Sequence, residues 1–203
     1  MAIFIENKRR KPENILKLHP DAVIIDVTSN AADEYQQLSP FYPIGNIPVP
    51  GMPKEEALCV EGIWQGLKVF ENYDWDAYYF TISTKNIKRT VRKFGWVKGH
   101  YFKGKLLSYV DARKQIYLPA YKTVLENKRK YLVDKLRSLA EKQTLVLLDY
   151  TTNASILDPK KPLSHAAVIR AAILKDYDIL EQDITQVEKP KGRTDFVQGD
   201  LFK

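Results

Sequence analysis

The chain contains very little cysteine, and this limits the kinds of site that it can form. Cys59 is the only cysteine among 203 residues, so disulfide frameworks and cysteine-based metal sites are excluded. The only histidines are His19, His100 and His165, and we therefore expect no structural zinc and no metal or other cofactor. Cys59 opens an apolar segment, a setting that does not activate a thiol as a nucleophile.

Long apolar runs are also absent. No stretch approaches the roughly 20 apolar residues that a transmembrane helix needs. Residues 1–14, MAIFIENKRRKPEN, have too short an apolar run for a secretory signal, and this run precedes the basic residues instead of following them. We therefore expect a cytoplasmic protein that does not associate with membranes.

Several familiar catalytic signatures are missing. The sequence has no glycine-rich dinucleotide loop after a strand, no P-loop, no GxSxG motif and no HExxH motif. These absences argue against the nucleotide-cofactor, phosphoryl-transfer, serine-hydrolase and zinc-protease classes. The side chains that are left for chemistry are carboxylates, amides and lysine.

The apolar content is sufficient for a substantial core, at 44% hydrophobic and 11% aromatic residues. We predict one α+β domain over residues 1–183, predominantly helical with a small β-sheet, and a flexible polar tail over residues 184–203. Thirty-two Lys and Arg against 25 Asp and Glu give a formal net charge of +7. This charge favours a polyanionic or phosphate-bearing partner.

Apolar periodicity and β-branched runs predict the secondary structure along the chain. We expect strands at 2–6, 22–27, 105–110 and 144–148, and helices at 12–17, 59–70, 84–94, 111–141 and 165–175. Pro119 is expected to kink or split the long helical stretch, and two helices in series are favoured over one. Proline and glycine exclude a regular helix from residues 38–53, which we predict to be an ordered loop.

The predicted helix at 59–70, CVEGIWQGLKVF, carries a polar column on an otherwise apolar surface. Glu61, Gln65 and Lys68 follow at i, i+4 and i+7 and therefore share one side of a helix. Gly62 and Gly66 lie beside this column, where each costs about 1 kcal/mol relative to alanine, so a close approach to the backbone is expected there. The alternative is that a partner helix packs on the glycines while Glu61 and Lys68 form a solvated pair.

Two segments supply further candidates. In loop 38–53, Phe41 and Tyr42 stand between prolines and either line a ligand site or cover one end of the core. The predicted helix at 84–94 carries cations that either face solvent or contact phosphate: Lys85, Lys88, Arg89, Arg92 and Lys93.

A third set follows the strand at 144–148. Asp149 and Asn153 come at its carboxyl end, where sites on mixed α/β folds often collect. Ser164 is a suitable N-cap for the next helix. His165, in the first turn of that helix, is either a surface or capping residue or a catalytic one.

Loop 38–53 and the helix at 59–70 together resemble a known family. LSPFYP followed by VEGIWQGLKVF is similar to the N-terminal half of NADAR proteins, in which a loop like LSNFYP precedes a helix like SVEHAYQALKF. The resemblance covers residues 36–72, and the matching residues are Leu38, Ser39, Phe41, Tyr42, Pro43, Val60, Glu61, Gln65, Lys68 and Phe70. The chain therefore resembles a divergent NADAR protein, which implies a NADAR-like fold.

The resemblance implies an N-glycosidase, because NADAR proteins cleave N-glycosidic bonds of phosphoribosyl-pyrimidines or remove ADP-ribose from modified bases. Glu61 and Lys68 are then catalytic. A carboxylate can stabilise an oxocarbenium-like ribose or activate water, and a lysine can hold a phosphate, lower the pKa of the glutamate or attack the opened sugar. The residues expected to bind a nucleotide or ADP-ribose-type substrate are Ser39, Phe41, Tyr42, Gly62, Trp64, Gln65, Lys88, Arg89, Arg92, Asp149, Asn153 and His165.

Two other functions stay open. One is a non-enzymatic nucleic-acid-binding module that uses the basic helix at 85–93, with DNA or RNA as its partner. The other is a NADAR-like sensor that binds ADP-ribose without cleaving it. In the tail, Gln198, Leu201 and Phe202 resemble the peptide that binds the bacterial sliding clamp, which makes the clamp a further predicted partner.

Overall fold

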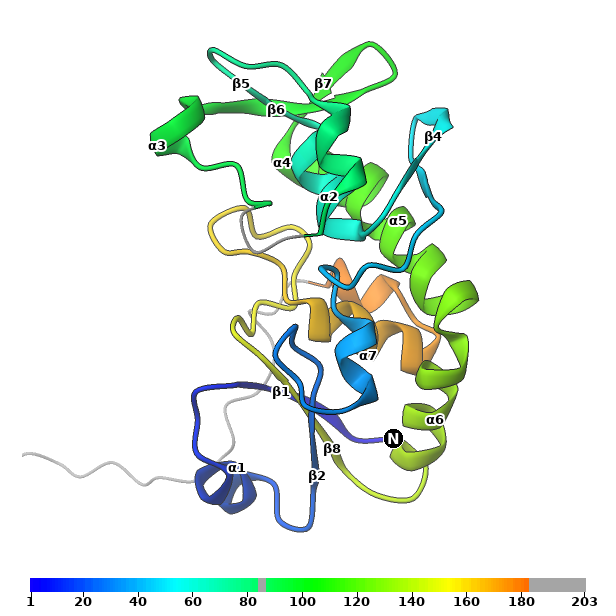
Figure 1. Cartoon of the computed structure of the whole chain (residues 1–203). Coiled ribbons are helices and arrows are strands. Elements are labelled where there is room, and N and C mark those ends of the chain that lie inside the picture. The colour runs from blue at the N-terminus through cyan, green and yellow to red at the C-terminus, as the bar shows by residue number, and fades with distance from the viewer. Residues whose placement is uncertain (84–86, 183–203) are drawn as a thin grey trace, which may run out of the picture.

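A three-stranded parallel sheet forms the centre of this α+β fold. The computed structural model describes residues 1–83 and 87–182. In it, β8 (Leu145–Asp149) lies between β1 (Ile3–Asn7) and β2 (Val23–Asp26), as Figure 1 shows. All five residues of β8 are buried, as is usual for the central strand of a parallel sheet. The three predicted strands are therefore confirmed, each within one residue at either end.

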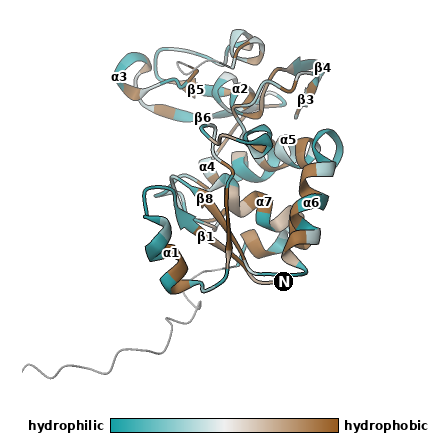
Figure 2. Cartoon of the chain, turned by 60° about the horizontal axis from the view of Figure 1, so that its bottom comes forward, coloured by the Kyte–Doolittle hydropathy of each residue, from teal (hydrophilic) through white to brown (hydrophobic). Residues whose placement is uncertain are grey.

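Helices cover both faces of this sheet. Leu145 and Leu147 of β8 join the main core with α7 (His165–Leu174), whereas Val146 and Leu148 pack with Ile15 of α1 (Pro12–Leu18). Successive side chains of a strand point to opposite faces, which explains this division. Helix α6 (Lys130–Ala140) packs on α7, and Figure 2 shows the hydrophobic colouring of β8 between these layers.

The helical stretch before α6 does not break where the sequence predicts. It runs through α4 (Tyr109–Ala112), the π-helical η3 (Arg113–Tyr117), α5 (Leu118–Thr123) and the π-helical η4 (Val124–Lys128). Pro119 lies in the first turn of α5, and the wider π turn before it accommodates the ring and the missing N–H. The stretch breaks instead at Arg129, whose φ is −128° and ψ 23°. The favoured prediction of a split at Pro119 is therefore wrong.

The remaining elements form a second group above the sheet in Figure 1. It contains the hairpin β3 (Ile47–Val49) and β4 (Met52–Ala57), helix α2 (Val60–Gly66), η2 (Ala77–Thr81), α3 (Val91–Phe94) and the antiparallel sheet of β5 (Lys68–Phe70), β6 (Val97–Phe102) and β7 (Lys105–Leu107). The short 3₁₀ segments η1 (Glu34–Leu38) and η5 (Asp178–Leu180) complete the described fold.

Two predicted helices are shorter than expected. The helix at 59–70 ends at Gly66, and Lys68 opens β5, because residues 68–70 pair with β6. The helix at 84–94 is reduced to α3 (Val91–Phe94) among its described residues, and Arg89 is buried although it was predicted to face outward. In both cases long-range contacts override the local helical pattern.

The strand expected at 105–110 is also shorter, since β7 ends at Leu107 and α4 begins at Tyr109. The tail at 184–203, with its proposed clamp-binding residues, and Lys85 lie outside the described residues. Among the helices of residues 1–83 and 87–182, none has the length and apolar character needed to cross a bilayer.

Candidate active site

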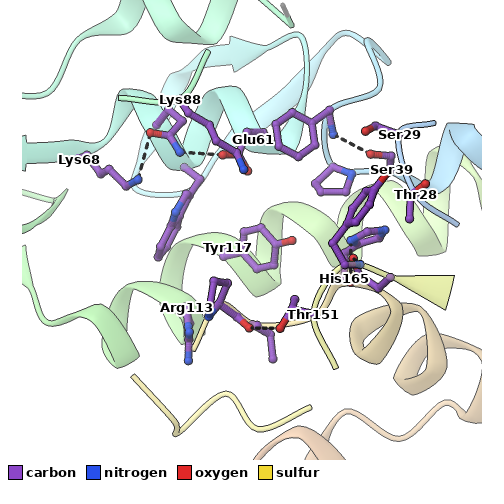
Figure 3. Close-up of a pocket in the computed structure, with 18 of the residues that line it drawn as sticks. Thr28, Ser29, Ser39, Glu61, Lys68, Lys88, Arg113, Tyr117, Thr151 and His165 are labelled. Carbon is purple, nitrogen blue, oxygen red and sulfur yellow. Dashed lines mark hydrogen bonds and ion pairs between the residues drawn. The ribbon is translucent and has the colours of Figure 1, made fainter. Parts of the chain in front are cut away.

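A pocket of about 550 Å³ lies between the carboxyl edge of the parallel sheet and α2 (Figure 3). Thr28 and Asp149 line it from the ends of β2 and β8, and Glu61 and Trp64 line it from α2. The predicted site residues that it brings together are Ser39, Phe41, Glu61, Trp64, Gln65, Lys68, Lys88, Asp149 and His165. Segments more than 100 positions apart in the sequence therefore share one cavity.

Helix α2 is held in place by its two glycines. A Cβ on Gly62 would lie 2.5 Å from the carbonyl oxygen of Tyr79, and one on Gly66 would lie 2.4 Å from Cε1 of Phe80. The predicted close approach is therefore real, but the approaching group is the η2 segment of this same chain. Gly62 does not line the pocket, so its predicted role in substrate binding is wrong.

Gln65 joins the two residues predicted to be catalytic. Its Nε2 donates to Oε1 of Glu61 at 2.7 Å, and its Oε1 accepts from Nζ of Lys68 at 3.0 Å. The backbone N–H of Arg89 donates to the same Oε1 at 3.0 Å, which fixes the orientation of the amide. Figure 3 shows this chain of side chains along one wall of the pocket. Lys68 thus meets Gln65 although it lies on a strand and not on the helix.

The environment drives both end groups toward their neutral forms. Burial raises the pKa of Glu61, and the hydrogen bond from Gln65 and the charges of Lys68 and Lys88 offset this only in part. Burial also lowers the pKa of Lys68 to about 8; the charge of Glu61 opposes this change, and those of Lys88 and Arg89 reinforce it. Lys68 can therefore lose its proton near neutral pH, and Glu61 holds a proton more readily than an exposed carboxyl does.

The opposite wall contains a second acid and base pair. Asp149 Oδ2 accepts from Ser164 Oγ at 2.6 Å and lies 2.9 Å from Nδ1 of His165, and Asp149 Oδ1 accepts from the Tyr150 N–H at 2.6 Å. Nε2 of His165 lies 2.9 Å from the carbonyl oxygen of Val27. Both ring nitrogens thus face acceptors, which is the arrangement that a doubly protonated imidazolium requires.

The pKa shifts of this second pair agree with that geometry. Burial favours the neutral forms, but the mutual hydrogen bond and charge outweigh it, so the pKa of Asp149 is lowered and that of His165 is raised. Ser164 uses its hydroxyl on Asp149 and makes no side-chain cap on α7, so the predicted capping bond is absent. The pair ties the ends of β2 and β8 to the start of α7.

Several predicted substrate-binding residues lie elsewhere. The guanidinium of Arg89 donates to the carbonyl oxygens of Gln65, Lys68 and Asp74 at 3.3, 2.8 and 2.9 Å, so it secures the chain at the end of α2. Arg92 is exposed on α3 and does not line the pocket. Asn153 donates to the carbonyl oxygen of Lys161 and organises the loop after β8. The predictions for Arg89, Arg92 and Asn153 are not supported by their positions.

Tyr42 lies in an adjoining compartment of about 600 Å³. Ser39, Phe41 and Lys88 line both this compartment and the main pocket, and Nζ of Lys88 lies 5.4 Å from the centre of the Phe41 ring. Phe41 and Tyr42 therefore line cavities instead of merely covering the core. Lys88 is the residue of the predicted basic helix that reaches the pocket, among those described.

One protein family matches residues 7–169, and its description is "Family of unknown function (DUF6939)". The chain belongs to this family. The matched range contains every residue that lines the main pocket, from Thr28 to His165. No curated protein and no solved structure matches the chain.

Sequence reasoning missed several residues in or beside this pocket, among them Arg113, Tyr117 and His100. Arg113 is buried and donates to the carbonyl oxygens of Ile156 and Asp158 at 3.1 and 2.6 Å, which fixes the loop at the pocket rim. Tyr117 points its hydroxyl into the pocket (Figure 3), and none of the described residues hydrogen-bonds it. Both residues lie within the predicted helix at 111–141, and a polar group on the buried side of a helix is the signal that could have indicated them.

The third of these residues is His100, which lies behind Trp64. The two ring centres are 3.9 Å apart, and neither ring nitrogen of His100 has a partner among the described residues. Burial, and in smaller part the charge of Lys68, lowers the pKa of His100 to about 3. A neutral imidazole therefore supports the aromatic wall of the pocket.

Proposed function

We propose that this protein is an N-glycosidase that cleaves a ribose C1′–N bond, in a nucleotide, an ADP-ribosylated base or a related phosphoribosyl compound. The observation that carries the proposal is the hydrogen-bonded series of buried Glu61, buried Gln65 and half-buried Lys68 on the wall of a pocket large enough for a ribose phosphate. The same three residues are among those that carry the resemblance to NADAR proteins. On this proposal the fold is NADAR-like and the protein is a cytoplasmic enzyme.

The chemistry requires a carboxylate beside the ribose. Breaking a C1′–N bond develops positive charge on the sugar, which a carboxylate stabilises while it takes a proton from the attacking water. The raised pKa of Glu61 makes its carboxylate a stronger base than an exposed one, which suits a group that accepts and returns a proton. We assign the acid and base role to Glu61.

Lys68 supplies the second function. With a pKa of about 8, an appreciable fraction of its amine is neutral at physiological pH. The neutral amine can attack the opened sugar, and the protonated form can hold a phosphate and favour the ionised Glu61. Gln65 already uses its Oε1 to accept from Lys68 and one N–H to donate to Glu61. Its role is therefore to position these two residues more than to bind ribose hydroxyls.

The rim provides contacts for the rest of the substrate. Lys88 is exposed at the junction of the two compartments and suits a phosphate, while Phe41 beside it offers a ring face for a base. Trp64 forms the aromatic wall next to Glu61.

The direct experiment measures the release of ADP-ribose or ribose phosphate from a panel of N-glycosides. Glu61→Gln is expected to keep the fold and ligand binding but to lower kcat by about two to four orders of magnitude, the range of a lost general base. Glu55→Gln, at an exposed position on β4, is the matched control and should leave turnover unchanged. Undiminished turnover in Glu61→Gln would remove this residue from the mechanism.

A sensor that uses the same pocket is distinguished by the same assay. It would bind ADP-ribose in calorimetry with no product from any member of the panel. The non-enzymatic module with a basic helix at 85–93 finds less support, since the described part of this segment is helical only over α3 and Arg89 is buried.

A further inference from the structure

Most of the net positive charge of the protein lies in one segment of the chain. Residues 66–110 contain nine Lys and Arg against three Asp and Glu, a net charge of +6, so the other 158 residues share a net charge of +1. Between Ala77 and Val110 there is no acidic residue at all. This segment forms η2, α3 and most of the antiparallel sheet β5–β6–β7, at the top of Figure 1.

Most of these cations are exposed to solvent and form no ion pair with a described residue. Arg92 and Lys93 on α3, Lys98 on β6 and the hairpin residues Lys103 and Lys105 are exposed, and none forms an ion pair with a described residue. Some exposed lysines elsewhere are paired, as Lys130 is with Asp134 and Lys135 with Glu34. Unpaired cations that lie close together repel one another, and this repulsion is relieved when a polyanion binds.

An exposed aromatic ring stands among these cations. Trp96, between Lys93 and Lys98 in sequence, is 70% exposed. Its backbone is fixed, because its N–H donates to Oε2 of Glu71 at 3.1 Å and its carbonyl oxygen accepts from the Glu71 N–H at 3.0 Å. Tyr73, also exposed, packs edge-on against Phe94 of α3 with the ring centres 5.0 Å apart. A rigidly mounted ring with open faces can stack on an unpaired base.

The same segment continues to the pocket. Lys88 lies four residues before Arg92 and lines both the main pocket and the adjoining compartment. For a nucleic-acid strand whose phosphates contact the cations of α3 and β6, Lys88 at the pocket rim would therefore be the next cation along the chain. Lys98 also lines a groove with Glu71, Asp74 and Lys105, whereas Arg92, Lys93 and Trp96 do not line it, so we centre the contact on α3 and Trp96.

We propose that the surface formed by Arg92, Lys93, Trp96 and Lys98 binds single-stranded nucleic acid. The cations contact phosphates and the indole of Trp96 stacks on a base, which a duplex does not offer. Neither kind of contact requires a 2′-hydroxyl, so DNA and RNA strands bind alike. The binding does not depend on glycosidase activity, although the strand would lie at the mouth of the same pocket.

Fluorescence anisotropy with a labelled 20-nucleotide oligothymidine tests the proposal on the full chain. Arg92→Gln, Lys93→Gln and Lys98→Gln together should weaken binding and reduce the slope of log K against log salt by about 2, since each phosphate contact contributes about 0.7 on single strands. The control is Lys11→Gln, Lys17→Gln and Lys142→Gln, three exposed lysines near α1 and the end of α6. It removes the same charge and should change the slope by much less.

Trp96→Ala should weaken binding about tenfold or more with the salt slope unchanged, because stacking is not electrostatic. Circular dichroism should show that this variant stays folded, since the ring is exposed. Tighter binding of duplex than of single strands, equal loss in the two triple variants, or affinity for anionic lipid vesicles that exceeds affinity for the oligonucleotide would each overturn the proposal.

Discussion

The two walls of the pocket each combine a buried carboxylate with a basic side chain, yet the pKa values of the two combinations move in opposite directions. On the sheet side, Asp149 and His165 are shifted toward their charged forms. On the α2 side, Glu61 and Lys68 are shifted toward their neutral forms. Asp149 receives hydrogen bonds from Ser164, the Tyr150 N–H and His165, whereas Glu61 receives one, from Gln65, among the described residues.

This difference separates a structural pair from a reactive one. A buried charge that is fully hydrogen-bonded holds segments together and has little capacity left for substrate. A buried charge that lacks partners stays poised between protonation states and can gain partners from a ligand. We therefore place chemistry at Glu61 and Lys68 and structural support at Asp149 and His165.

The largest expected effect is a loss of stability when the Asp149 and His165 pair is disrupted. Asp149→Asn removes one partner of a buried pair and leaves His165 uncompensated, which should lower the free energy of unfolding by about 3–5 kcal/mol. Glu61→Gln removes a charge that folding disfavours and should change it by less than about 1 kcal/mol. Urea denaturation of the two variants measures both values. Equal losses of unfolding free energy in the two variants would show that the two pairs do not differ in their contribution to stability.

The second prediction concerns Lys68. Lys68→Met should lower kcat by about a hundredfold or more if the amine takes part in the reaction. Since the reactive form is the neutral amine, the wild-type rate should rise with pH and level off above a pKa of about 8. Borohydride trapping followed by mass spectrometry locates any imine between Lys68 and the sugar. A rate independent of pH from 6 to 9 would contradict the nucleophilic role.

Tyr121 and Tyr117 differ in the same way, one with a structural hydrogen bond and the other with a hydroxyl that faces the pocket. The hydroxyl of Tyr121 donates to the carbonyl oxygen of Leu38, whereas the hydroxyl of Tyr117 points into the pocket without a described partner. Tyr121→Phe should cost about 1–3 kcal/mol of stability by leaving a buried carbonyl unpaired. Tyr117→Phe should leave stability within about 0.5 kcal/mol and lower kcat/KM by about tenfold. A stability loss of the same size in both variants would contradict this assignment.

The smallest expected effect is the pH dependence of stability that arises from the Asp149 and His165 pair. The raised folded-state pKa of His165 contributes stability that is complete below about pH 6.5 and is lost as the pH rises through that folded-state pKa. The lowered pKa of Asp149 contributes stability that is present above about pH 3.9 and is lost as the pH falls through its folded-state pKa.

The difference in unfolding free energy between wild type and Asp149→Asn should therefore be largest between about pH 4 and 6.5. Denaturation curves at half-unit pH intervals measure this window. A difference that stays constant up to pH 9 would show that His165 is not charged in the pair.

The sequence by itself determined the local elements of this protein. The three parallel strands, α1, α7 and the start of α2 follow from residue type and period alone, and so does the close approach at Gly62 and Gly66. Glu61 and Gln65 could be paired in advance, because four positions on a helix always place side chains together.

Only the tertiary structure decided what these elements meet. Arg89 belongs to a cationic stretch, yet it is buried, because its guanidinium donates to the carbonyl oxygens of Gln65, Lys68 and Asp74. Lys68 lies on β5 and not on the helix, because its backbone pairs with β6. The opposite pKa shifts of the two pocket walls depend on burial and on hydrogen-bond partners far away in the chain, and local sequence patterns contain neither.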